Sequence, residues 1–186
     1  MKLLADVPSG SELLLHICCA PDAAYGAVAL RERFDVTGFF YNPNIHPQEE
    51  FRKRLMATLD LTDRSPFPLV VGTGGEAVWE EAVRGLEGEP ERGRRCEACV
   101  RLRLRETARK ASELGMPAFG TVLTVSPKKD AAMVNRVGRE EAERAGVEFL
   151  AADLKKRDGY LKSVRAAREM GIYRQRYCGC RYSYRP

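Results

Sequence analysis

The six cysteines of the 186-residue chain fall into three pairs, and none lies outside them: Cys18-Cys19, Cys96-x-x-Cys99 and Cys178-x-Cys180. Thiolates at such short spacings bind soft metals, bind clusters or react with each other. Three pairs offer more sulfur than the four ligands that one tetrahedral zinc ion takes. The surplus indicates an iron–sulfur cluster, with thiols left for redox chemistry or for a second metal.

The Cys18-Cys19 pair follows a short apolar run and precedes Pro21 and Asp22. A turn between a strand and a helix can aim both thiols at one centre, and the positive end of the helix favours thiolates there. Two other interpretations stay open. Free cysteines are often small buried residues of a core. Asp22 can cap the helix instead of binding a metal, or do both.

The other two pairs differ in their surroundings. Cys96 and Cys99 stand at the entrance of a predicted helix, after several arginines that favour the thiolate form. Cys178 and Cys180 flank a glycine in an extended segment, where a disulfide would close a small, strained and easily reduced ring. That spacing favours a switchable pair, although an incidental pair in an irregular tail would have the same pattern.

The elements that must position these cysteines alternate along the chain. Short runs rich in strand-forming residues predict strands at 13–17, 36–41, 68–71, 118–123 and 147–150. Between and after them the composition predicts helices at 22–33, 47–63, 75–86, 97–114, 126–146 and 158–170, with Ser126-Pro127 starting the fifth. The alternation predicts an α/β fold with a mostly parallel sheet. Cys18 and Cys19 then follow the first strand, where such sheets bind ligands.

The chain shows no repeat and no low-complexity linker, so we expect residues 1–186 to form a single domain with an irregular tail from Tyr173 onward. No apolar run resembles a secretory signal or a membrane span. We therefore expect a cytoplasmic protein without membrane association, in which the cysteines are reduced and do not form structural disulfides.

Charge narrows the class of partner. The net charge is only +5, but Lys and Arg crowd residues 92–110 and 155–186, next to cysteine pairs. Such runs are often solvated helix faces. Their coincidence with the cysteines favours a polyanionic substrate held over a redox centre.

The remaining candidates for chemistry are weaker. His16 sits inside the first predicted strand, where a hydrogen-bonded core histidine is commoner than a catalytic one. His46 follows Asn42-Pro43-Asn44, a loop that could line a pocket, and the tyrosines can stack on bases or simply pack. The chain contains no G-x-G-x-x-G, Walker A or Ser-Gly-Gly phosphate loop.

Five ordered motifs resemble the QueH-type epoxyqueuosine reductases: LLHICCAP at 14–21, FFYNPNIHP at 39–47, RCEAC at 95–99, SPKK at 126–129 and GIYRQRYCGC at 171–180. The resemblance implies an enzyme that reduces the epoxide of epoxyqueuosine to the alkene of queuosine at the wobble position of tRNA. It implies a 4Fe–4S cluster, in some members an additional mononuclear iron, and a Rossmann-like fold of the ATP-pyrophosphatase (HUP-like) class. Its partners would be tRNAs with GUN anticodons (Asp, Asn, His and Tyr) and an unidentified electron donor, and we expect a monomer.

The resemblance also implies roles for individual residues. It assigns four cysteines as cluster ligands and two as a redox-active pair: Cys18, Cys19, Cys96 and Cys99 in the first set, Cys178 and Cys180 in the second. Asp22 stands where many relatives have a third cysteine, so we expect it to bind the cluster or a neighbouring iron and to take part in catalysis. The expected substrate-binding residues lie in the same motifs: His16, Tyr41, Asn42, Asn44, Arg95, Lys128, Arg174 and Tyr177.

Three other functions fit part of the pattern. A zinc-stabilised RNA-binding module would use the cysteines without catalysis, and it would be colourless instead of brown. A tRNA-thiolating enzyme would activate its target with ATP, which the missing phosphate loop disfavours. A thiol–disulfide oxidoreductase is disfavoured because no thioredoxin-type motif follows the first strand.

Overall fold

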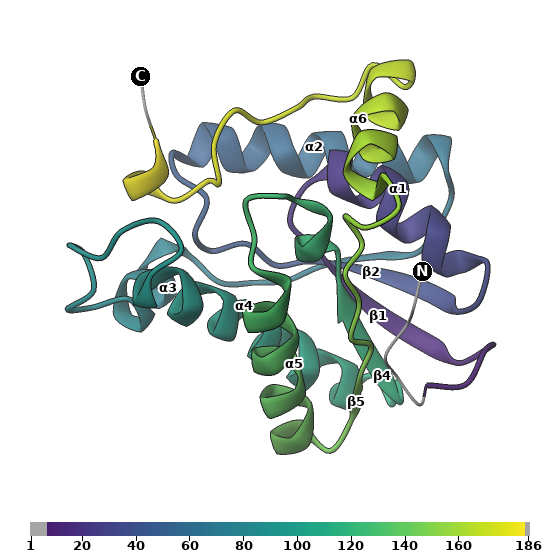
Figure 1. Ribbon diagram of the computed structural model, residues 1–186, viewed down its shortest axis with the longest axis horizontal. Coiled ribbons are helices and arrows are strands. Elements are labelled where there is room, and N and C mark those ends of the chain that lie inside the picture. The colour runs from purple at the N-terminus through teal and green to yellow at the C-terminus, as the bar shows by residue number, and fades with distance from the viewer. Residues whose placement is uncertain (1–6, 185–186) are drawn as a thin grey trace.

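The computed structural model describes residues 7–184, and its centre is a sheet of five parallel strands (Figure 1). The strands are β1 (Glu12–Ile17), β2 (Asp35–Phe40), β3 (Leu69–Val71), β4 (Ala118–Thr121) and β5 (Glu148–Phe149). They lie in the order β3-β2-β1-β4-β5, so that β1 is central and the chain crosses from one edge to the other side of β1 between β3 and β4. The predicted Rossmann-like parallel sheet is confirmed.

Helices cover both faces of this sheet (Figure 1). One layer contains α1 (Ala20–Arg31), α2 (Gln48–Arg64) and α6 (Gly159–Glu169), and the other contains α3 (Glu76–Ala82), α4 (Arg94–Glu113) and α5 (Ala131–Ala145). Two short 3-10 helices complete the described elements: η1 (Val122–Val125) directly after β4, and η2 (Arg181–Ser183) in the tail.

Strand β1 is buried on both faces, as a central parallel strand should be. Leu13, Leu15 and Ile17 belong to the core under α1 and α2, whereas Leu14 points into the core under α4 and α5. Successive side chains therefore alternate between two apolar layers. The end of β1, where Cys18 follows, is fixed between two packed cores.

The helix predicted to start at Ser126 starts later, at Ala131. Asp130 caps it, because its Oδ1 accepts hydrogen bonds from the backbone N–H groups of Ala132 (2.8 Å) and Met133 (3.3 Å). The helix ends at Gly146, whose positive φ of 68° closes the last turn. Residues 126–129 form a turn instead of a helix start, and this turn reaches the site described below.

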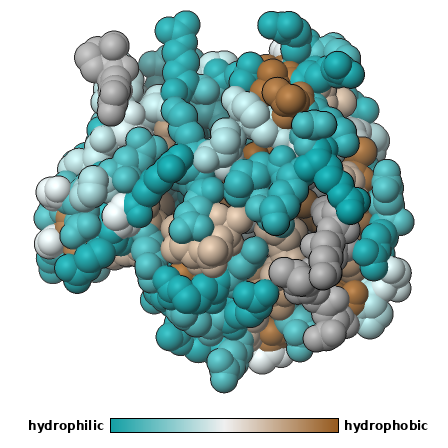
Figure 2. Space-filling model, in the orientation of Figure 1, coloured by the Kyte–Doolittle hydropathy of each residue, from teal (hydrophilic) through white to brown (hydrophobic). Residues whose placement is uncertain are grey.

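After α6 the chain runs across α2 and ends near α3, and this segment is irregular until η2, as predicted (Figure 1). No helix in the described part of the chain is both long and apolar enough to cross a membrane. The face seen in Figure 2 is mostly hydrophilic, and its hydrophobic atoms form small, separate patches.

Candidate active site

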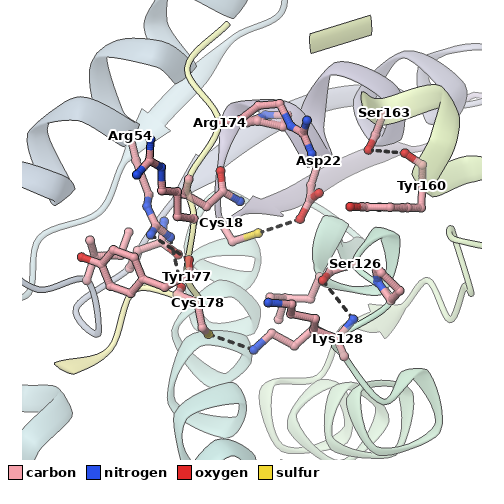
Figure 3. Close-up of a pocket in the computed structure, with 18 of the residues that line it drawn as sticks. Cys18, Asp22, Arg54, Ser126, Lys128, Tyr160, Ser163, Arg174, Tyr177 and Cys178 are labelled. Carbon is pink, nitrogen blue, oxygen red and sulfur yellow. Dashed lines mark hydrogen bonds between the residues drawn. The ribbon is translucent and has the colours of Figure 1, made fainter. Parts of the chain in front are cut away.

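A cavity of about 250 Å³ lies at the carboxyl ends of β1 and β4 (Figure 3). Cys18 follows β1 directly, and the 126–129 turn comes shortly after β4. The strand order reverses between these two strands, which is the usual ligand site of an open α/β sheet. The polar lining residues on which the chemistry depends are Cys18, Asp22, Asn42, Asn44, Arg54, Arg103, Lys128, Lys129, Arg174, Gln175, Tyr177 and Cys178.

Cys18, Cys19 and Asp22 form a compact group of metal-ligating atoms at the start of α1. The two sulfurs are 3.7 Å apart, and Asp22 Oδ2 is 3.5 Å from Cys18 Sγ. All three ligand atoms lie within 4.8 Å of one another, close enough to hold one metal ion. Burial raises the pKa of the Asp22 carboxyl to about 6.

The alternative role of Asp22 as a helix cap is wrong. The backbone position before the first turn of α1 is occupied by Cys19, and no side chain caps this helix end. Asp22 lies inside the first turn with its carboxyl group turned to Cys18 (Figure 3). Its position next to two sulfurs favours the metal-ligand interpretation.

Cys96 and Cys99 lie in the first turns of α4, as predicted, but outside the compact group. The Cys99 thiol is buried, and burial raises its pKa. Cys96 Sγ is half-buried and accepts a hydrogen bond from the backbone N–H of Arg92 at 3.2 Å. A cluster of several iron atoms spaces its ligands more widely than a single ion does, so the gathering of all four cysteines stays a prediction.

Arg103 is a buried cation that faces the cysteines. Its side chain is 2% exposed, and its Nη2 donates to Asn42 Oδ1 at 2.8 Å while its Nε donates to His16 Nε2 at 3.3 Å. Burial alone would lower the pKa of the Arg103 guanidinium. The nearby sulfurs of Cys99 and Cys18 together have the larger effect, so the pKa lies above its usual value. No carboxylate among residues 7–184 lies within ion-pair distance of Arg103.

Lys129 is a second cation that, like Arg103, lies close to cysteine sulfur. Its Nζ lies 2.9 Å from Cys178 Sγ, drawn as a dashed line in Figure 3. Burial raises the pKa of the Cys178 thiol, but Lys129 and the nearby arginines outweigh burial and lower it. Cys178 is therefore disposed to be a thiolate. Cys180, by contrast, is buried and donates to the Ser183 hydroxyl at 3.4 Å.

The donor set fits an anionic metal–sulfur group. A buried cation, Arg103, and a half-buried one, Lys129, have no carboxylate partner in the described chain and therefore require negative charge nearby. The cysteine sulfurs are the groups positioned to supply it, and thiolates are the form that binds iron. Gln175 adds a neutral donor, because its Nε2 lies 2.9 Å from Cys19 Sγ.

Arg54 from α2 fixes the tail over the cavity. Its guanidinium donates to the carbonyl oxygens of Cys178 and Tyr177, both at 3.0 Å, and it pairs with Glu50 at 2.7 Å. Gly179 has a φ of 120°, and a Cβ there would stand 3.1 Å from Arg54. The glycine between the two cysteines thus allows the tail to approach α2 closely.

Five of the eight predicted substrate-binding residues line the cavity: Asn42, Asn44, Lys128, Arg174 and Tyr177. The other three do not. His16 is fully buried behind Arg103, and burial, followed by Arg103, lowers its pKa well below the usual value. It is a neutral residue that positions Arg103, as the core interpretation has it.

The structure also places Tyr41 and Arg95 away from the cavity. The Tyr41 ring is buried and stacks on Phe39 with a centroid distance of 5.8 Å. Arg95 donates to the carbonyl oxygens of Glu87 (2.8 Å) and Glu89 and lies over the Tyr182 ring. Arg95 therefore orders the preceding loop. Neither residue lines the cavity, and their contact with substrate stays a prediction.

Several residues of the site were not predicted. Arg103, Lys129, Gln175 and Arg54 all line the cavity. The spacing of Cys96, Cys99 and Arg103 puts them on one face of a helix, and this signal could have identified Arg103. Lys129 lies in the SPKK motif beside Lys128, whereas nothing local in the sequence marks Arg54.

Sequence comparison identifies the family. A family model described as epoxyqueuosine reductase QueH matches residues 13–186. The chain belongs to the QueH family of epoxyqueuosine reductases. It is 40% identical over 181 residues to the QueH of Streptococcus pyogenes serotype M1, covering 92% of this chain and 69% of that one. It is 37% identical over 176 residues to the QueH of Thermotoga maritima, covering 92% and 89%.

Two solved structures share the fold of this QueH family member at 12% sequence identity. The U34-tRNA thiolase NcsA from Methanococcus maripaludis, solved with its 4Fe–4S cluster, has a TM-score of 0.61 and is matched over 95% of this chain and 62% of its own. A predicted tRNA methyltransferase subunit from Methanocaldococcus jannaschii has a TM-score of 0.57, with 84% and 74% covered. At this identity the likeness concerns the fold alone.

Proposed function

We propose that the protein reduces the epoxide of epoxyqueuosine to the alkene of queuosine at the wobble position of tRNA, the last step in making that nucleoside. The observation that carries the proposal is a pair of cations, the buried Arg103 and the half-buried Lys129, that face cysteine sulfur without carboxylate partners in the described chain. They lie at the ligand end of a sheet in a chain of the epoxyqueuosine reductase family. The substrates are tRNAs with GUN anticodons, which are cytoplasmic.

Cys18, Cys19, Cys96 and Cys99 hold a 4Fe–4S cluster in this proposal. The groups around these cysteines support this assignment. Arg103 offers a positive charge, and Gln175 offers a hydrogen bond to sulfur. When bound, the cluster supplies single electrons, and an additional iron beside it supplies a Lewis acid for the epoxide oxygen. Asp22 binds that additional iron in this proposal, supported by the position of its carboxyl 3.5 Å from Cys18 Sγ.

Removal of the epoxide oxygen as water takes two electrons and two protons. Oxidation of the Cys178 thiolate, which lies beside Lys129, and the Cys180 thiol to a disulfide releases two electrons and one proton, and water supplies the second proton. The pair can therefore store the reducing equivalents, and an external donor must reduce the disulfide again. Replacing either cysteine by serine and still observing complete conversion in a single turnover would refute this role.

Basic residues at the rim bind the anticodon loop. Lys128 and Arg174 stand on opposite sides of the cavity (Figure 3), and further cations continue along residues 155–168. Phosphate contacts release counterions, so affinity for the RNA falls as salt rises. We expect binding of an anticodon stem–loop to weaken at least tenfold between about 50 and 200 mM salt, roughly what a few phosphate contacts produce. Unchanged affinity would contradict the RNA interface.

Conversion of the nucleoside tests the function directly. Protein purified without oxygen and loaded with iron and sulfide is mixed with a stem–loop carrying epoxyqueuosine and a chemical reductant. Nucleoside mass spectrometry should show loss of one oxygen atom, independent of ATP. Colourless protein with stoichiometric zinc and no conversion would favour the RNA-binding module, and dependence on ATP would favour a thiolating enzyme.

A further inference from the structure

Two acceptor atoms in the cavity wall have no donor. No hydrogen-bond donor among residues 7–184 reaches Oδ1 of Asn44 or Oε1 of Gln175, and both atoms are shielded from solvent. Asn44 as a whole is only 1% exposed to solvent. Buried polar atoms in native proteins nearly always have a partner. Two exceptions in one cavity indicate that a bound molecule supplies the donors.

The surroundings fix how these amides point. The Nε2 of Gln175 donates to Cys19 Sγ at 2.9 Å, and a metal-ligating thiolate can only accept, so Oε1 turns the other way. Asn44 lies against Gly179, where a Cβ would stand 3.3 Å from Asn44 Nδ2. The glycine between the redox cysteines leaves room for the asparagine beside Cys178.

The charge of the cavity selects the kind of donor. The cavity wall contains two carboxylates, Asp22 and Glu91, and a larger number of cations. The cations are Arg54, Arg103, Lys128, Lys129, Arg174 and Arg176. A further positive charge is repelled there, whereas a neutral O–H group can donate to an amide oxygen and accept from a neighbouring cation. Neutral hydroxyl groups therefore match the two unpaired oxygens best.

We propose that Asn44 and Gln175 form a subsite that accepts hydrogen bonds from the hydroxyl groups of the substrate's cyclopentane diol. The subsite rests on the proposed function for the identity of the substrate. The diol adjoins the epoxide and is absent from unmodified guanosine. Asn44 and Gln175 are thus specificity-determining residues that distinguish the modified base from its precursor base and hold the epoxide near Cys178.

Equilibrium binding of two RNAs tests the subsite. One anticodon stem–loop carries epoxyqueuosine at the wobble position, and its partner carries guanosine there. The iron-loaded wild-type protein should prefer the modified RNA, and Asn44→Leu should lower that preference about tenfold, the effect of one lost hydrogen bond to a buried acceptor. Asn44→Asp keeps the oxygen, loses the N–H donor and should keep the preference. Gln175→Met should lower the preference by a similar factor.

Asn135→Leu is the matched control. The Asn135 amide is paired at both ends with the backbone of Ala152, at 3.2 and 3.3 Å, and it does not line the cavity. This variant should retain the full preference, and binding of the guanosine RNA shows that each variant is folded.

Three outcomes would overturn the subsite. An undiminished preference in Asn44→Leu would show that the Asn44 oxygen does not contact the modified base. Loss of preference in both Asn44→Leu and Asn44→Asp would show that the amide N–H donates to the substrate instead. A wild-type protein without preference would also contradict it. Preference without conversion of the nucleoside would instead contradict the proposed function and leave the subsite standing.

Discussion

Arg101 and Arg103 stand two residues apart on α4 and serve opposite purposes. Arg101 is partly exposed and pairs with three carboxylates: Glu97 (3.3 Å), Glu140 (2.6 Å) and Glu141 (2.8 Å). Arg103 is buried and bonds to Asn42 and His16, with cysteine sulfurs as its nearest negative groups.

The difference shows that one face of α4 stabilises the fold and the other contributes to the site. On one face of α4, Arg101 pairs with carboxylates of α5 and joins the two helices. On the opposite face, Arg103 has no carboxylate partner in the described chain and faces the cysteine sulfurs. Composition alone does not separate these two roles, because both arginines lie in the same basic run. A buried cation without a carboxylate is the sign of the functional face.

Loss of the buried arginine should have the largest effect. Arg103→Leu leaves the sulfurs without their counter-charge and strips His16 and Asn42 of a donor. We expect iron content to fall well below one cluster per chain and conversion to fall by about a hundredfold or more, as when a preorganised charge is removed from a site. Iron analysis and single-turnover assays measure both. Normal iron content and turnover would show that the sulfurs do not depend on this cation.

Removing the second cation should have an intermediate effect, on the reactivity of Cys178. The Lys129 ammonium favours the thiolate, so in the wild-type protein the alkylation of Cys178 should rise with pH at a midpoint below 9.0, the usual value. In Lys129→Met the burial and the arginines remain without the ammonium, so the midpoint should move to a higher pH than in the wild-type protein. Peptide mass spectrometry after timed alkylation follows this cysteine alone. The neighbouring variant Lys128→Met is the control, and an unchanged profile in Lys129→Met would disprove the pairing.

Loss of the carboxylate-paired arginine should have the smallest effect. Arg101→Leu breaks contacts that are partly open to water, so the free energy of unfolding should fall by about 1 kcal/mol. Glu141 keeps its contact with Arg144. Iron content should stay at the wild-type level, and denaturant unfolding with iron analysis reports both quantities. A loss of iron equal to that of Arg103→Leu would remove the distinction between the two faces.

Local patterns in the sequence were enough to predict the fold and the place of the first cysteine pair. The apolar run before Cys18 reads as a buried strand, and the alternation of elements implies that ligands bind at its carboxyl end. Ser126-Pro127 misled because Asp130, four residues later, is the stronger cap for α5. Propensity favours both starts, and the tertiary position of the turn decides between them.

The rest of the site depends on contacts between residues far apart in the chain. The tail is held by Arg54, more than a hundred residues before Cys178, and no local pattern encodes that pairing. Tyr41 and Arg95 lie in motifs that reach the site, but their side chains turn into a core stack and a loop. Adjacency to a motif therefore predicts the neighbourhood of a residue and not the direction of its side chain.

The most direct test of the central claim is the content of iron and acid-labile sulfide, with electron paramagnetic resonance, in protein purified without oxygen. We predict one reducible cluster per chain in the wild-type protein, its loss in Cys19→Ala and in Cys96→Ala, and retained sulfide in Asp22→Ala. Cys96 is the decisive position, since it lies outside the compact group of Cys18, Cys19 and Asp22. An unchanged cluster signal in Cys96→Ala, or zinc without sulfide in the wild-type protein, would contradict a cluster shared by the two cysteine pairs.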